Sequence, residues 1–188
     1  IYGSAGVNQL FGNDGNDVVY TSAAGDFAAG GAGNDSIFGA DGADTIFAGL
    51  GDDFIGGGAG NDAIFAGAGA NRIYGGVGND TITAGVGKDV VTGGPGADAF
   101  VFASAAAIGI GAARDVITDF TPGVDDIDLR SLGTTFNGTA GVLGGGTASF
   151  FHFVAGGLLI GDQNGDGAAD WVLELSGAPN VTAADFLL

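Results

Sequence analysis

The sequence predicts an all-β fold, a parallel β-roll of two short-stranded sheets capped by a C-terminal antiparallel β region. Three observations predict it. A nine-residue pattern recurs without interruption from Gly3 to Val101. The 188 residues include 41 Gly, which disfavours long helices. No apolar run approaches the roughly 18 residues of a membrane span.

Composition excludes several partners and cofactors. Lys and Arg total 4 against 22 acids, a formal net charge of -18, which argues against nucleic acid and anionic membranes. All of the acids except Glu174 are Asp, which suits turns and short-reach metal ligation. Without Cys, neither disulfides nor thiolate metal sites can form. The chain opens within the pattern, at "IYGS", so we expect a piece of a longer protein.

The pattern has eleven units of nine residues between Gly3 and Val101. Its eighth position is aliphatic in ten of them and Phe100 in the last. Its sixth position is acidic in nine units, and the other two carry Asn8 and Asn71. The candidate metal-ligating carboxylates are therefore Asp17, Asp26, Asp35, Asp44, Asp53, Asp62, Asp80, Asp89 and Asp98.

Nine residues divide into a turn and a short strand. Gly at positions one, two and four allows tight backbone curvature, and the eighth side chain points inward. Two units make one coil of 18 residues, and stacked coils lie roughly 4.8 Å apart. Asp35 is then expected above Asp17, and Asp44 above Asp26. Two carboxylates about 5 Å apart repel by about 3 kcal/mol at an effective dielectric near 20. A hard divalent cation removes that repulsion, and the oxygen-rich turns suit Ca²⁺ better than Mg²⁺.

The units resemble the RTX nonapeptide, G-G-x-G-x-D-x-U-x, and this resemblance covers residues 3–101. It implies a calcium-binding parallel β-roll that holds several Ca²⁺ ions in its turns. Two units depart from the motif. "TSAAGDFAA" has lost three glycines, so sites that use Asp26 should be weak or altered. "AGAGANRIY" has Asn71 beside Arg72, so we expect weak or empty sites there, and Asn8 is likewise a weak candidate.

Residues 102–188 are expected to form the cap, with residues 1–101 as the roll. "RDVITDF" and "GVDDIDL" repeat the spacing of an Asp two residues before an Ile, so Asp115 and Asp125 are candidates for the last carboxylates of the roll. The alternative is that they are ordinary acids at strand ends. "FFHFV", "LLIGD" and "DWVLELSG" predict antiparallel strands that cap the open end.

One segment of the cap, "GDQNGDGAAD", follows the spacing of an EF-hand loop. Asp162, Asn164, Asp166 and Asp170 fall at its positions one, three, five and nine. Position twelve is Leu173 instead of Glu. An additional calcium site and a hairpin turn rich in Asn-Gly and Asp-Gly both remain open.

"DVITDFTPGVDDIDL", "GDQNGDGAADWVLELSG" and "TAADFLL" together resemble the C-terminal region of serralysin-type secreted metalloproteases, over about residues 98–188. That resemblance implies a zinc protease domain upstream and an uncleaved C-terminal signal for the type I secretion apparatus. Asp185, Phe186, Leu187 and Leu188 match the signal, an acid followed by apolar residues. Two features depart from the family: eleven units are more than its short rolls have, and H-E-x-x-H is absent.

These observations predict a calcium-induced folding and secretion module of a larger extracellular protein, from a Gram-negative bacterium. The chain itself carries no G-x-S-x-G, no Cys and no histidine pair, so we do not expect an enzyme. The alternative is a surface-assembly or adhesion module, as in S-layer proteins. Self-association would then use the outward-facing aromatic residues at position nine: Phe11, Tyr20, Phe38, Phe47, Phe65 and Tyr74.

Overall fold

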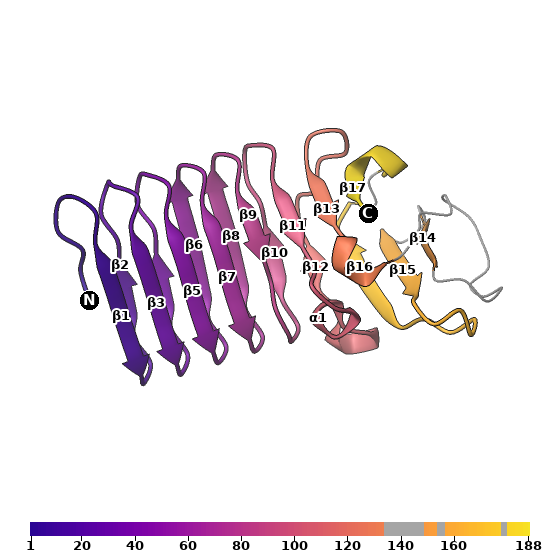
Figure 1. The fold of residues 1–188 in the computed structure, drawn as a ribbon, viewed down its shortest axis with the longest axis horizontal. Coiled ribbons are helices and arrows are strands. Elements are labelled where there is room, and N and C mark those ends of the chain that lie inside the picture. The colour runs from indigo at the N-terminus through magenta and orange to yellow at the C-terminus, as the bar shows by residue number, and fades with distance from the viewer. Residues whose placement is uncertain (134–148, 154–156, 178–179) are drawn as a thin grey trace.

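The protein is a two-walled β-solenoid followed by a β cap (Figure 1). The structure is a computed structural model that describes residues 1–133, 149–153, 157–177 and 180–188. Its described strands form one sheet of eight and one of nine, and the short coils alternate between them. The predicted parallel β-roll is confirmed.

The first sheet has the strand order β1-β3-β5-β7-β9-β11-β13-β17. Its strands are β1 (Gln9–Asp14), β3 (Phe27–Ala32), β5 (Thr45–Leu50), β7 (Ala63–Ala68), β9 (Thr81–Thr83), β11 (Ala99–Val101), β13 (Asp126–Asp128) and β17 (Phe186–Leu187).

The second sheet has the order β14-β15-β16-β12-β10-β8-β6-β4-β2. Its strands are β2 (Val18–Tyr20), β4 (Ser36–Phe38), β6 (Phe54–Ala59), β8 (Arg72–Val77), β10 (Val90–Thr92), β12 (Val116–Ile117), β14 (Ser149–Phe153), β15 (Leu158–Asp162) and β16 (Trp171–Leu175).

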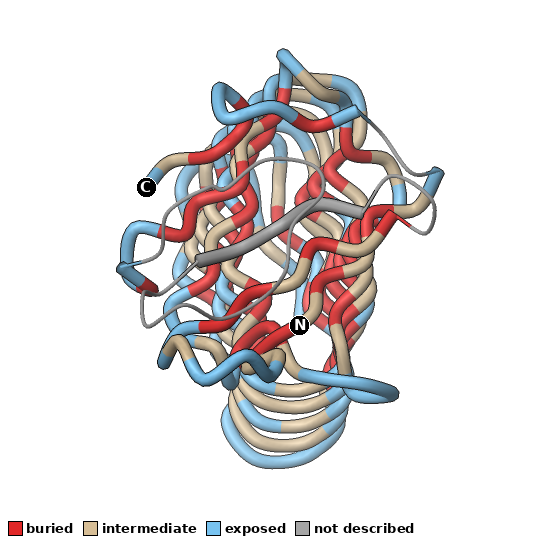
Figure 2. The backbone as a smooth tube through the Cα atoms, turned by 90° about the vertical axis from the view of Figure 1, so that its right-hand side faces the viewer, coloured by how far each residue is buried: buried red, intermediate tan, exposed pale blue. Residues whose placement is uncertain are grey.

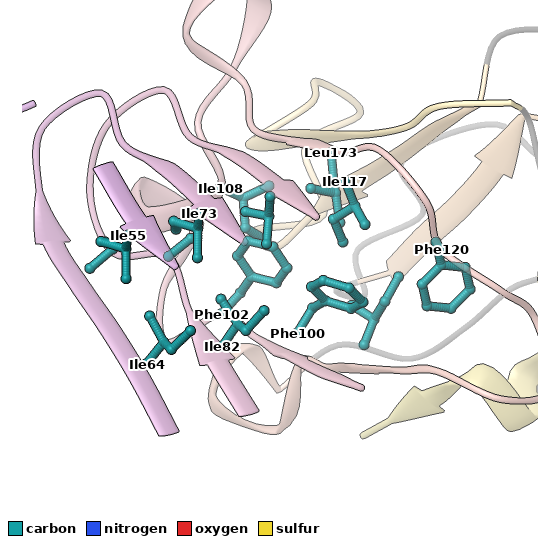
Figure 3. Packing of buried hydrophobic residues seen from close by; sticks show 14 of the residues in the cluster. Ile55, Ile64, Ile73, Ile82, Phe100, Phe102, Ile108, Ile117, Phe120 and Leu173 are labelled. Carbon is teal, nitrogen blue, oxygen red and sulfur yellow. The ribbon is translucent and has the colours of Figure 1, made fainter. Parts of the chain in front are cut away.

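The register follows the nonapeptide. Parallel partners are 18 residues apart, as in Ile46 opposite Ile64 and Ile55 opposite Ile73. The eighth-position side chains from both sheets point into one core, and Ile55 and Ile73 face Ile64 and Ile82 in Figure 3. Because each strand buries every second residue, the core is one side chain deep from each wall.

The view along the roll shows the coils superimposed, with buried residues lining both walls and exposed residues concentrated in the turns (Figure 2). Burial of aliphatic side chains in such a thin core gives each coil only a small share of stabilisation, about 25 cal/mol per Å² of apolar surface. The stability of each coil therefore depends strongly on the interactions made in its turns.

Stacking continues past Val101. β12 pairs in parallel with β10, and β13 pairs in parallel with β11. A short insertion between β11 and β12 holds α1 (Ala105–Ile108), capped by Ser104, and the 3-10 turn η1 (Gly111–Ala113). The division into residues 1–101 and 102–188 stays a prediction, although both sheets run through it without a break.

The cap extends both sheets. β14, β15 and β16 form an antiparallel meander, and β16 also pairs in parallel with β12, which joins the meander to the roll. In the other sheet β17 pairs with β13. The 3-10 turns η2 (Arg130–Leu132) and η3 (Ala183–Asp185) connect these strands. Among the described residues, no helix has the length and apolarity needed to cross a membrane.

Candidate metal centre

The sixth-position residues form two ladders, one along each edge of the roll. The Asp17 ladder lies in the turns that lead from the first sheet to the second; its rungs are Asp17, Asp35, Asp53, Asn71, Asp89 and Asp115. The Asp26 ladder lies in the turns that lead back, and its rungs are Asn8, Asp26, Asp44, Asp62, Asp80, Asp98 and Asp125. Nearly all rungs are buried.

Each rung is tied to the next by one of its two side-chain oxygens. The backbone N–H of Asp62 donates to Oδ1 of Asp80 at 2.8 Å, and that of Asp80 donates to Oδ1 of Asp98 at 2.9 Å. The same bond recurs along both ladders. Oδ1 is therefore part of the fold, because it accepts a backbone donor that would otherwise be unpaired.

The second carboxylate oxygen, Oδ2, has no partner at eight rungs. It is buried without a hydrogen bond in Asp17, Asp35, Asp53, Asp62, Asp80, Asp89, Asp98 and Asp115. An unpaired buried acceptor costs about 1–3 kcal/mol, and more where the group is charged. A regular array of such atoms is what a set of cations would satisfy.

The glycines at position one leave room for a cation beside these oxygens. A Cβ at Gly75 would lie 2.5 Å from Oδ2 of Asp80 and 2.5 Å from the carbonyl oxygen of Gly93 in the next coil. Ca²⁺ binds oxygen ligands at about 2.3–2.6 Å and accepts both carboxylates and backbone carbonyls. We call such a space, bounded by a carboxylate and the carbonyl of the following coil, a cradle. The residues present therefore fit Ca²⁺.

Side chains alone do not complete a metal site. In the part of the chain that the structure describes, no three His, Cys, Asp or Glu side chains converge on one point. Because stacked rungs bring only neighbouring carboxylates together, the remaining ligands must be backbone carbonyls of the turns. Ca²⁺ takes 6–8 oxygens and tolerates this mixture.

Burial raises the pKa of these carboxyl groups. Desolvation lifts the pKa of Asp53, Asp80, Asp89 and Asp98 to about 6, because it outweighs the backbone N–H bond that each one accepts. At Asp115 it raises the pKa to about 8. A bound divalent cation would reverse this by favouring the ionised form.

Asp26 differs because the unusual third unit supplies hydroxyls. Burial raises its pKa, but the hydrogen bonds from the Ser22 backbone and hydroxyl and from Asn8 together outweigh that effect, and the pKa is lowered. Both Ser22 groups donate to Oδ2 of Asp26, at 2.6 and 2.8 Å. The Thr21 hydroxyl likewise donates to Oδ2 of Asp44 at 3.0 Å. The sequence shows that this unit is atypical. It does not show that the Ser22 and Thr21 hydroxyls donate hydrogen bonds to two carboxylates.

Asp115 and Asp125 lie at the C-terminal ends of the two ladders. Their Oδ1 atoms accept the backbone N–H of Asp89 at 2.7 Å and of Asp98 at 3.0 Å. The pairing of Val116 with Glu174 places Leu173 at the next ladder position after Asp115. Beyond Asp115, an apolar residue therefore follows the carboxylates. Metal binding by these two rungs stays a prediction.

In the EF-hand-like loop the carboxylates turn toward the backbone of the loop itself. Both oxygens of Asp162 accept backbone N–H groups, from Gly165 at 2.6 Å and Gly167 at 2.9 Å. Asp170 accepts those of Gln163 and Asn164, and Asp166 accepts that of Ala168. This is the bonding of a turn, while a calcium site formed by Asp162, Asn164, Asp166 and Asp170 stays a prediction.

The residues expected to form a secretion signal are built into the cap. Asp185 is buried, and its carboxylate accepts the backbone N–H of Gly123 at 2.5 Å and of Thr182 at 2.5 Å. Phe186, in β17, is buried and lies opposite Ile127 of β13. Leu187 continues β17, and Leu188 ends the chain half-exposed.

Two features of the turns are not predicted from the sequence, namely the contacts of Asp119 and a ladder at position five. Asp119 accepts the backbone N–H groups of Gly93 and Gly94 at 2.9 and 2.8 Å. Position five forms a further ladder that runs in the opposite sense, as where the N–H of Asn34 donates to Oδ1 of Asn16. The recurring "GND" was the available signal for this outer ladder, which also uses Asp52, Asn61 and Asn79.

Comparison with known proteins identifies the class to which this roll and its ladders belong. The family described as the RTX calcium-binding nonapeptide repeat (4 copies) matches residues 1–28, 20–55, 29–64, 56–91 and 65–100. These matches cover more than half of the chain, so the protein belongs to the RTX calcium-binding repeat family. Its repeats bind Ca²⁺, as expected.

Solved structures carry the comparison further. The AlgE6R2 subunit of the Azotobacter vinelandii mannuronan C5-epimerase is similar, with 28% identity and a TM-score of 0.56 over 75% of this chain and 90% of that one. The AlgE6R3 subunit of the same enzyme matches with 23% identity and a TM-score of 0.42, over 95% of this chain and 78% of that one. Among curated proteins nothing matches. The chain is an RTX repeat module, like the AlgE6R2 subunit.

Proposed function

We propose that this chain is a calcium-induced folding module of a larger extracellular protein. The observation that carries the proposal is the array of eight buried Oδ2 atoms without a partner. Each is stacked between coils, where like charges repel and solvent is excluded. The fold is therefore costly without cations and becomes favourable when they bind.

The energetics favour a switch between two environments. Calcium sites of extracellular modules have dissociation constants of about 0.1–1 mM, far above the free calcium of a cytosol. A site filled at 100 times its dissociation constant adds about 2.7 kcal/mol to stability. Several such sites together add a free energy comparable to the net stability of about 5–15 kcal/mol typical of a domain.

We further propose that the module accompanies secretion from a Gram-negative bacterium through a type I apparatus, which exports the chain unfolded. The support is the serralysin-like C-terminal sequence, ending in Asp185, Phe186, Leu187 and Leu188. On this proposal the upstream domain of the same polypeptide is a zinc metalloprotease. Finding H-E-x-x-H upstream of residue 1 tests that parentage, and deleting the last four residues tests the export signal.

Surface assembly is the second candidate because aromatic rings line the outer faces of both sheets. On the first sheet, neighbouring ring centroids from Phe11 to Phe65 lie 4.5–5.6 Å apart. Phe11 and Phe47 remain 51% and 41% exposed. Sedimentation of the purified chain in calcium, against a variant with Phe11 and Phe47 changed to Ser, tests whether these rings join copies.

The primary test is a far-UV circular dichroism titration of chelator-treated protein with calcium, with magnesium as the control. Trp171 is the only Trp and is fully buried in β16, so its fluorescence reports separately on the cap. We expect a cooperative gain of β signal with calcium alone, at sub-millimolar to millimolar concentration. A chelated chain that is already folded and does not respond would contradict the proposal.

A further inference from the structure

The rungs of the two ladders are not equivalent, because position one of the repeat carries three kinds of residue. It is Gly at Gly3, Gly12, Gly30, Gly39, Gly57, Gly75 and Gly93, Ala at Ala48, Ala66 and Ala84, and Thr at Thr21. At these glycines other than Gly3, a Cβ would lie close to the carboxylate of the same unit, whereas the Thr21 hydroxyl reaches Asp44 in the following coil. The chemistry of position one therefore decides what can lie beside each Oδ2 atom.

Four rungs combine an open cradle with an unpaired oxygen. A Cβ at Gly57 would lie 2.5 Å from Oδ2 of Asp62, and one at Gly12 would lie 2.8 Å from Oδ2 of Asp17. In both, the carbonyl of the next coil is the other near neighbour. The four pairs are Gly12 with Asp17, Gly30 with Asp35, Gly57 with Asp62, and Gly75 with Asp80. Gly93 differs, because a Cβ there would lie close to Oδ2 of Asp98 but 3.0 Å from the Phe100 ring, with no carbonyl of a following coil among its nearest neighbours.

At three rungs a methyl group takes the place of the open space. Ala48, Ala66 and Ala84 are fully or almost fully buried, and each stands at position one of a unit in the Asp17 ladder. Their Cβ atoms occupy the position that is empty at the cradle glycines. The rung that goes with Ala66 is also uncharged, since it is Asn71. Arg72 and Lys88 lie next to Asn71 and Asp89 in the sequence and add positive charge along this part of the ladder.

At two rungs hydroxyl groups already satisfy the oxygen. Thr21 donates to Oδ2 of Asp44, and Ser22 donates to Oδ2 of Asp26. Neither oxygen is among the unpaired atoms. These rungs need no cation to balance their hydrogen bonding.

We propose that, within residues 3–101, Ca²⁺ binds tightly only at the four cradle rungs, two on the Asp17 ladder and two on the Asp26 ladder. The array then changes edge along the roll: its N-terminal sites lie at Asp17 and Asp35, and its later sites at Asp62 and Asp80. Methyl groups weaken the rungs at Asp53, Asn71 and Asp89, and hydroxyls replace the ion at Asp26 and Asp44. This inference rests on the proposed calcium binding and assigns it to particular rungs.

The test compares three single substitutions by counting tight calcium ions, with equilibrium dialysis and calorimetry. Gly75→Ala puts a methyl group into a cradle, 2.5 Å from both Oδ2 of Asp80 and the carbonyl oxygen of the next coil, so these atoms must shift. The φ of Gly75 lies outside the left-handed region, so the dihedral angles themselves permit Ala. Ala48→Gly opens a cradle beside Asp53. Gly56→Ala is the matched control, because a Cβ there would meet nothing within 4 Å.

We expect Gly75→Ala to bind one tight ion fewer than the unmodified chain, Ala48→Gly one more, and Gly56→Ala the same number. An unchanged stoichiometry in both Gly75→Ala and Ala48→Gly overturns this assignment while leaving calcium-induced folding intact. A chain that binds no calcium overturns the proposed function as well. If Gly75→Ala does not fold at saturating calcium, the gain or its absence in Ala48→Gly decides the question.

Discussion

At most rungs a single carboxylate performs two tasks. Oδ1 accepts a backbone N–H from the neighbouring coil, and Oδ2 is left for a cation. Asn71 separates the two tasks, because its Oδ1 still accepts the N–H of Asp53 at 3.0 Å while its Nδ2 points to the Gly69 carbonyl at 3.4 Å. An amide preserves the ladder but gives up the charge, which is why the register survives the substitution.

Asp80→Asn should therefore weaken calcium binding without dissolving the fold at saturating calcium. The amide oxygen can still accept the N–H of Asp62, but one charged ligand is lost, a change worth roughly 1.5–3 kcal/mol or about 10- to 100-fold in affinity. Calorimetric titration measures the effect. Asp41→Asn is the matched control, because Asp41 is exposed and this substitution removes the same charge from the surface. Equal affinities for the two variants would contradict a ligand role for Asp80.

Each sheet carries an aromatic ladder that stays continuous by changing position. Most rings stand at position nine, but where that residue is Ala29 or Gly56, position seven of the same unit supplies Phe27 or Phe54. Phe54 thus bridges Phe38 at 5.5 Å and Tyr74 at 5.6 Å between ring centroids. A ring at either position covers the outer face of the same rung, so the pair is interchangeable.

Phe54→Ala should lower the stability of the calcium-loaded roll by about 1–3 kcal/mol, because it removes two ring contacts and half-buried apolar area. Adding Gly56→Phe should restore most of that loss by returning the ring to position nine. The space there is open, since a Cβ at Gly56 meets nothing within 4 Å. Urea unfolding of the three chains in calcium measures this. A double variant no more stable than Phe54→Ala would refute the exchange.

At the scale of the whole molecule, sequence reasoning succeeds where contacts have a fixed spacing. Strand partners lie 18 residues apart, and this spacing predicts the coil, both ladders and the inward-facing rows of Ile. The pattern is lost after Val101 because the turns lengthen: the spacing becomes 26 residues from Asp89 to Asp115 and 27 from Asp98 to Asp125. Bonds such as Arg114 to Glu174, 60 residues apart, depend on the finished fold and have no periodic signal.

The site divides in the same way. The positions of the carboxylates follow from the period, and so does their burial. Their pairing does not, because Thr21 reaches Asp44 across 23 residues through a hydroxyl that only the folded coil brings near. Asp185 is similar: the secretion signal predicted there stays a prediction, and the bonds that its carboxylate accepts from Gly123 and Thr182 depend on the finished fold.

The ladders also predict how the whole chain responds to pH when calcium is absent. Burial raises the folded-state pKa of Asp53, Asp80, Asp89 and Asp98 to about 6 and of Asp115 to about 8, from 3.8. Folding therefore takes up protons at pH values between the ordinary pKa of 3.8 and the raised pKa of each group. The proton-linked stability is fully present below 3.8 and is lost as pH rises through about 6 and then about 8.

We therefore expect the calcium-free roll to gain stability on acidification from pH 8 toward pH 5, a range that stays above the pI of about 4.1. The stabilisation by calcium should instead decrease on acidification, because protons compete with calcium for the same carboxylates and the calcium affinity falls as pH falls. The folded fraction of calcium-stripped protein, followed by far-UV circular dichroism at several pH values, should rise on acidification, while the folded fraction at a fixed, subsaturating calcium level should rise less or fall. A stripped folded fraction that is flat or that declines toward pH 5 would mean that protonation of these carboxylates does not stabilise the roll. The empty ladders would then not be what keeps the calcium-free chain unfolded.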